Sequence, residues 1–117
     1  MYAQRATDKG LVIAEGTTVS ILGRGYLGAP GIYTDEQATG WKKVTDAVHV
    51  KGNSIFLQLW HVGRQSHIEM TNAQIPVATS AVQFEQVVVT KDGWVPVSSN
   101  RALQFPDHEK LLFLYFN

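Results

Sequence analysis

One stretch of the chain constrains its fold more than any other. Residues 55–64 read I-F-L-Q-L-W-H-V-G-R, a nearly continuous apolar run that closes on a glycine and an arginine. Apolar runs without polar alternation are typical of strands that are buried on both faces of a parallel sheet. We therefore expect a buried strand here, with the polar residue Gln58 at its centre.

The residues before this stretch predict a strand, a loop and a helix. Residues 11–15 form a short apolar run, and residues 21–33 are so rich in glycine that a helix is excluded there. A helix is expected over residues 35–51, because Thr34 and Gln37 have capping-box spacing and apolar residues then recur every three or four positions. The two strands should be parallel neighbours with a right-handed crossover.

The pattern changes after Gly63. Residues 67–80 are polar and irregular, whereas residues 83–89 and 94–97 predict two short strands. The residues between these strands include Lys91-Asp92-Gly93, a sequence typical of a hairpin turn.

Composition excludes several classes of function. The 117 residues suffice for one small domain, and the ten Lys and Arg balance the ten Asp and Glu. A net charge of zero gives no electrostatic attraction to nucleic acid or to an anionic membrane. The chain has no cysteine, which excludes disulfides and thiolate metal sites. It also has no signal-like segment and no apolar run near the roughly 20 residues of a spanning helix, so we expect a cytoplasmic protein.

Two motifs suggest sites but have simpler explanations. Gly23, Gly25 and Gly28 match the dinucleotide pattern G-x-G-x-x-G, but that pattern must open a helix, and here Ala29-Pro30-Gly31 follows. A glycine-rich active-site loop is the favoured interpretation. The residues His49, His61 and His67 do not have the spacing of zinc ligands, so we expect ordinary histidines and no metal.

Gln58 leaves two interpretations open. A buried amide needs hydrogen-bond partners, and a neighbouring strand or a bound polar ring could supply them. Trp60 has the same parity along the strand, so both side chains should point to the same side of the sheet. The pattern alone does not decide between a structural glutamine and one that lines a pocket.

Several blocks in fixed order resemble the old yellow enzyme family of FMN-dependent NAD(P)H ene-reductases, which includes the 12-oxophytodienoate reductases. The matching blocks lie at residues 2–6, 13–17, 25–31, 41–49 and 58–64. The resemblance covers residues 1–104, and residues 105–117 form a divergent tail. It implies an α/β fold in which residues 11–15, 35–51 and 55–62 are the second strand, second helix and third strand of a (β/α)8 TIM barrel, with a capping β-hairpin at residues 83–97.

The resemblance also implies roles for individual residues. Gln58 matches a glutamine that hydrogen-bonds the pyrimidine end of FMN, and Gly16 matches a small residue whose backbone approaches the flavin. Tyr26 and Trp60 match aromatic residues that line the pocket for a small enone-type substrate. Glu15 and Arg64 lie in matching segments without an assigned role.

The same mapping implies that other parts of the site lie outside this sequence. The first strand would precede Met1, and the pair that binds the substrate carbonyl, the proton-donating tyrosine and the phosphate site would follow Asn117. We therefore expect no catalytic residue within the chain and a fragment of an ene-reductase. The alternatives are a truncated, non-catalytic chain that associates with itself or with a full-length relative through unpaired strand edges, and a small independent binding module.

Overall fold

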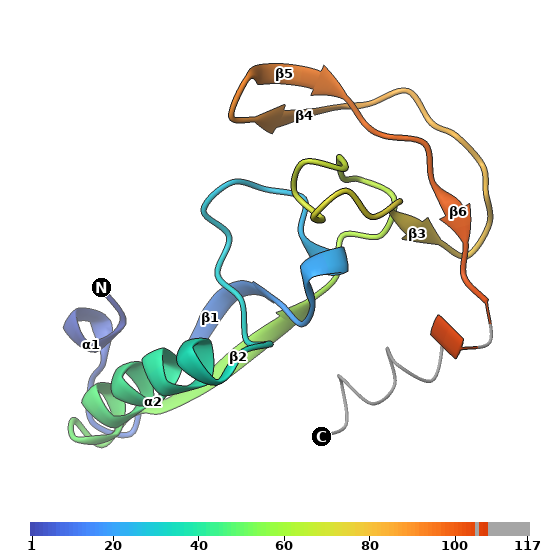
Figure 1. Ribbon diagram of the computed structural model, residues 1–117. Helices are drawn as coiled ribbons and strands as arrows, with labels where there is room; N and C mark the ends of the chain where they lie inside the picture. The colour runs from blue at the N-terminus through green and yellow to red at the C-terminus, as the bar shows by residue number, and fades with distance from the viewer. Residues whose placement is uncertain (105, 108–117) are drawn as a thin grey trace.

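The computed structural model describes residues 1–104, 106 and 107. Its longest elements follow each other as strand β1 (Leu11–Thr18), helix α2 (Asp35–His49) and strand β2 (Ser54–Trp60). The two strands pair in parallel, and α2 runs beside them (Figure 1). The predicted strand-loop-helix-strand order and the parallel pairing are confirmed.

Helix α2 starts with the capping box that the sequence predicted. The Thr34 Oγ1 accepts a hydrogen bond from the Gln37 backbone N–H at 3.2 Å, and the Gln37 side chain accepts one from the Thr34 N–H at 3.1 Å. The helix ends at His49, somewhat before the expected residue 51. Gly52 then takes the left-handed conformation, with φ 72°, that turns the chain toward β2.

The strand boundaries differ from the expected ones in a way that matters for the site. β1 continues to Thr18 instead of stopping at residue 15, so Gly16 lies within the strand. β2 stops at Trp60, which leaves His61 and Val62 in the following segment.

The expectation that both strands are buried on both faces is wrong for the described residues. Leu11, Ile13 and Phe56 are 59%, 66% and 64% exposed, although Val48 of α2 is fully buried. Among the described residues, the sheet that contains β1 and β2 has only these two strands, and one helix cannot cover both faces of a sheet. The two strands thus carry apolar side chains that no described residue covers.

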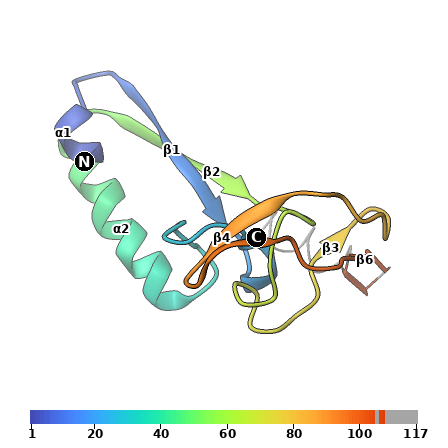
Figure 2. The same cartoon turned by 90° about the horizontal axis from the view of Figure 1, so that it is seen from above.

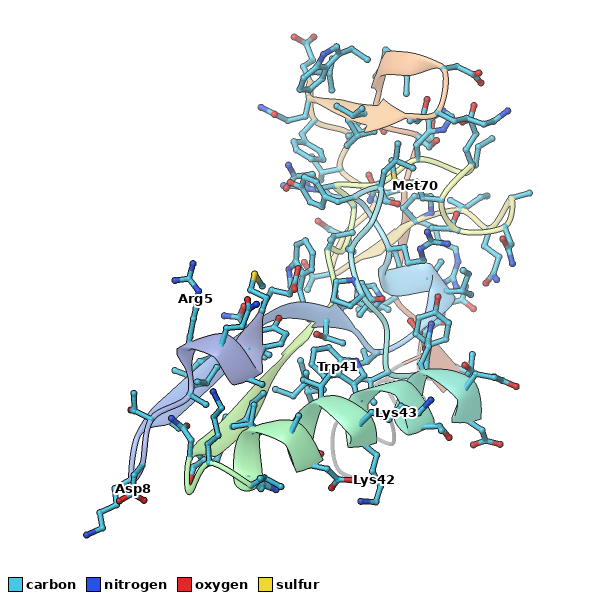
Figure 3. All side chains as sticks on the ribbon, turned by 90° about the vertical axis from the view of Figure 1, so that its left-hand side faces the viewer. Arg5, Asp8, Trp41, Lys42, Lys43 and Met70 are labelled. Carbon is cyan, nitrogen blue, oxygen red and sulfur yellow. The ribbon has the colours of Figure 1, made fainter. Side chains whose placement is uncertain are left out.

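The predicted hairpin is present, with a shorter first strand and a second strand shifted by one residue. β4 (Val87–Thr90) and β5 (Gly93–Pro96) pair antiparallel, and residues 83–86 lie outside them. Figure 3 shows Met70 beneath this hairpin, where it joins Val88 and Val97 in a small buried cluster. The hairpin therefore has a core of its own, away from α2.

Several short elements were not predicted. Helix α1 (Tyr2–Arg5) precedes β1, and the 3₁₀ helix η1 (Ile21–Gly23) follows it. β3 (Val77–Ala78) pairs in parallel with β6 (Arg101–Ala102), at the end of the molecule opposite to α1 (Figure 2).

Two further expectations concern the C-terminal tail and membrane-spanning helices. Residues 105 and 108–117 of the expected divergent tail lie outside the described residues. In the described part of the chain, no helix combines the length and the apolar character needed to cross a membrane.

Candidate functional site

The structure brings together all four residues that the sequence marked for a pocket. Gly16 and Gln58 are register partners in β1 and β2, and Trp60 ends β2. Tyr26 comes from the glycine-rich loop between β1 and α2, and its ring stacks on that of Trp60. The group lies at the C-terminal half of two parallel strands.

An irregularity in β1 sets this register. Ile13 pairs with Phe56 and Gly16 pairs with Gln58, so β1 has one residue more than β2 between these pairs. An extra residue of this kind is a β-bulge, and it re-aims the side chains that follow it. Without it, Glu15 rather than Gly16 would lie opposite Gln58.

Gln58 is exposed, and the expectation of a buried amide is wrong for the described residues. Its side chain makes no hydrogen bond with any described residue. The amide NH₂ and the amide carbonyl of Gln58 are therefore both available to a partner. Because the amide is not buried, it does not need a partner from a neighbouring strand to offset a cost of desolvation.

Gly16 and the two aromatic rings form one wall. A Cβ added at Gly16 would lie 3.0 Å from Cε3 of Trp60, so the indole fills the space that a side chain would need. The Trp60 and Tyr26 rings stack with their centroids 5.4 Å apart and their planes at 25°. Stacked aromatic pairs gain stability beyond the area they bury, so the wall is an ordered surface.

The loop that carries Tyr26 is held by the segment that follows β2. The Gly23 carbonyl accepts a hydrogen bond from the Val62 N–H at 3.1 Å, and the Arg24 carbonyl accepts one from Ser66 Oγ. Gly25 lies so close that a Cβ there would be 2.5 Å from the Gln65 carbonyl oxygen. Glycine at this position permits the contact between the two backbones.

Gln65 also reaches the aromatic pair. Its Nε2 donates a hydrogen bond to the Tyr26 hydroxyl at 3.0 Å, between residues 39 positions apart in the chain. No local signal in the sequence predicts this contact, because neither spacing nor periodicity links positions so far apart.

The other end of the loop is tied to β1 and α2. Thr18 and Gly31 form a parallel bridge, and Trp41 Nε1 donates a hydrogen bond to the Gly31 carbonyl at 3.0 Å. The loop thus crosses from the sheet to the helix without opening a helix at Gly28, which agrees with a structured loop instead of a dinucleotide fingerprint.

His61 is a neutral packing residue in this arrangement. Its Nδ1 accepts a hydrogen bond from the Gly63 N–H at 3.0 Å, which places the ring proton on Nε2. That Nε2 is buried and has no partner among the described residues. Burial lowers the pKa of His61 below its ordinary value of 6.5.

Glu15 and Arg64 make local contacts. The Tyr2 hydroxyl donates to Glu15 Oε1 at 2.7 Å, and burial together with this bond raises the pKa of Tyr2. Arg64 donates to the Val82 carbonyl at 2.9 Å and lies 4.7 Å from the ring centre of Phe84. Both residues thus join segments of the fold.

In residues 1–104, 106 and 107, no three His, Asp or Glu side chains gather in a group that could hold a metal ion.

Comparison with known sequences gives consistent matches. The model of the NADH:flavin oxidoreductase / NADH oxidase family matches residues 1–107. The 12-oxophytodienoate reductase 7 of Oryza sativa subsp. japonica is 54% identical over 80 residues, which are 68% of this chain and 20% of the relative. Chanoclavine-I aldehyde reductase of Penicillium roqueforti is 53% identical over 74 residues, 62% of this chain and 20% of that protein.

Solved structures match along nearly the whole chain. The old yellow enzyme homologue from Zymomonas mobilis aligns with a TM-score of 0.89 and 43% identity, covering 97% of this chain and 32% of the other. Morphinone reductase in complex with tetrahydroNAD aligns with a TM-score of 0.85 and 45% identity, covering 97% and 33%. The chain spans about a third of these structures and about a fifth of the sequence relatives above.

The contact at Gly25 makes a first testable prediction. Gly25→Ala puts a methyl group against the Gln65 carbonyl and should lower the free energy of unfolding by about 1–3 kcal/mol, the usual cost of overpacking. It should also weaken the near-ultraviolet circular dichroism that arises from the stacked Tyr26 and Trp60. Gly40→Ala, in the exposed part of α2 with open space around its Cβ, is the control and should be neutral or stabilising in urea unfolding. Equal stability and equal spectra of the two variants would contradict the proposed loop contact.

Burial of His61 predicts a pH dependence of stability. In the folded chain, His61 binds the second proton of its imidazole ring less tightly than in the unfolded chain. Unfolding therefore takes up protons as the pH falls below the ordinary pKa of 6.5. The contribution is fully present above that pH and is lost as the pH falls below it. His61→Asn keeps an acceptor for the Gly63 N–H without titrating, and its free energy of unfolding should fall less from pH 7 to pH 5. Parallel losses in the wild type and the variant, measured by urea unfolding at several pH values, would show that His61 is not responsible.

Proposed function

The chain belongs to the NADH:flavin oxidoreductase / NADH oxidase family, and from this premise we propose that it is the flavin-binding β/α segment of an FMN-dependent ene-reductase that uses NAD(P)H as reductant. One observation carries the proposal. Gly16 and Gln58 lie opposite each other at the C-terminal half of two parallel strands, beside the stacked rings of Tyr26 and Trp60. Parallel β/α folds hold their ligands at this end of the strands.

The open amide of Gln58 fits the pyrimidine end of FMN. That ring carries carbonyl acceptors and an N–H donor, and a primary amide offers both an NH₂ donor and a carbonyl acceptor. Gly16, the register partner of Gln58, has no side chain, so the Trp60 indole packs directly against the backbone beside this amide. Together these residues would hold and orient the flavin.

Tyr26 and Trp60 would line the substrate side of the same pocket. Their stacked rings offer a flat, mainly apolar surface that positions an unsaturated substrate and displaces water. When bound, FMN supplies the hydride chemistry, from NAD(P)H to the β-carbon of an activated alkene such as an α,β-unsaturated carbonyl compound. This chain's residues contribute position and hydrogen bonds.

We place β1, α2 and β2 as the second strand, second helix and third strand of an eight-stranded barrel, with the β4–β5 hairpin over its substrate mouth. A barrel of this kind needs about 250 residues. It would supply neighbours for the strand edges and cover the exposed side chains of Leu11, Ile13 and Phe56. The residues that bind the substrate carbonyl and supply the proton would come from other strands of the whole protein.

The same exposed side chains favour a second candidate function. Apolar groups on a two-stranded sheet with open edges are suited to pairing with another chain. In this candidate, the chain has no activity and associates with itself or with a full-length relative.

Titration with FMN tests the main proposal. The wild-type chain should quench flavin fluorescence, and Gln58→Leu should raise Kd about tenfold, which is about 1.4 kcal/mol and within reach of the hydrogen bonds lost. Gln4→Leu removes another exposed amide, on α1, and is the matched control, with an expected Kd equal to that of the wild type.

Sedimentation of the same samples separates the two candidates. A monomer that binds FMN in a Gln58-dependent way supports the flavin segment. Stable oligomers without quenching support the associating chain, and a Gln58→Leu variant with unchanged affinity contradicts the role of this amide.

A further inference from the structure

The hydrogen bond from Gln65 to Tyr26 determines the direction of the Tyr26 hydroxyl proton as well as the position of the ring. A tyrosine hydroxyl can both donate and accept a hydrogen bond. In this chain the Gln65 Nε2 donates to it at 3.0 Å, so the hydroxyl oxygen acts as an acceptor there. Its proton must point elsewhere, and no described residue accepts it.

The hydroxyl proton of Tyr26 lies at the candidate pocket. Tyr26 is 43% exposed, and its ring stacks on Trp60, which also contacts Gly16. The hydrogen bond between Gln65 and the Tyr26 hydroxyl is itself exposed, so a bound molecule can reach this hydroxyl.

We propose that Gln65 is a specificity-determining, positioning residue that makes Tyr26 a hydrogen-bond donor to the substrate. The inference rests on the proposed function, because it assumes that Tyr26 lines the substrate pocket. It adds a substrate class: unsaturated compounds that carry a second acceptor oxygen, placed to meet the Tyr26 hydroxyl, in addition to the carbonyl that activates the alkene.

Backbone contacts around Gln65 hold its side-chain amide next to the Tyr26 hydroxyl. The Gln65 carbonyl faces Gly25, where a Cβ would approach to 2.5 Å, and its N–H donates to the Val62 carbonyl at 3.3 Å. The next residue, Ser66, is buried and donates through its hydroxyl to the Arg24 carbonyl. The amide of Gln65 is thus presented from a segment attached to the loop that carries Tyr26.

A matched pair of ligands tests the proposal without any turnover. Cyclohexane-1,4-dione and 4-methylenecyclohexanone have the same ring and nearly the same shape, but only the dione has a second acceptor oxygen. Calorimetric titration of the full chain in saturating FMN gives the ratio of the two Kd values, corrected for the two equivalent ends of the dione. The wild type should favour the dione about tenfold.

Three single variants and one double variant then separate hydrogen bonding from a purely structural role. Gln65→Leu leaves the hydroxyl free to turn away from the ligand and should lower the ratio below that of the wild type, with the affinity for 4-methylenecyclohexanone retained. Gln65→Glu provides a carboxylate that accepts the Tyr26 proton, so the preference should reverse. Tyr26→Phe should give a ratio of one, and adding Gln65→Leu to it should change nothing further.

Each outcome decides a different claim. If Gln65→Leu and Gln65→Glu keep the wild-type ratio, or if the wild type shows no preference, the role of Gln65 is overturned and the pocket stands. If both affinities fall equally in the variants, Gln65 is only structural, which also overturns the proposal. If neither ligand binds the wild-type chain, the proposed pocket and this inference fail together.

Discussion

The parallel pairing of β1 with β2 is the constraint on which the rest of the site depends. Parallel strands end at the same edge, so the segments that leave them lie close together. The loop after β1 and the segment after β2 therefore meet, and the bulge in β1 places Gly16 opposite Gln58. A register without the bulge would put Glu15 there, in place of the glycine against which the Trp60 indole packs.

Glycines and short polar side chains turn this proximity into a defined wall. Gly25 allows the loop backbone to touch that of Gln65, and Ser66 and Val62 hold the loop by hydrogen bonds. Tyr26 is thereby set on Trp60. The contacts lie within residues 16–66, so the aromatic wall is formed by this chain itself, whereas the apolar side chains of Leu11, Ile13 and Phe56 on its sheet are exposed.

Local signals in the sequence predicted much of this structure. The capping box of Thr34 and Gln37 is confirmed, as are the parallel strands and the resemblance to the old yellow enzyme family. The strand ends, the bulge and the exposure of Gln58 were not predictable, because they depend on pairing between distant residues and on how many strands cover a face. The contact between Gln65 and Tyr26 also joins distant positions and leaves no periodic trace.

The most direct test of the account is to locate FMN on the chain by nuclear magnetic resonance. With isotope-labelled protein, FMN should shift the side-chain amide of Gln58 and the backbone amide of Gly16, and flavin protons should show contacts to one or both. The amides of the β4–β5 hairpin should shift far less. Shifts confined to that hairpin, or none at Gly16 and Gln58 at saturating FMN, would contradict the claim that these two residues hold the flavin.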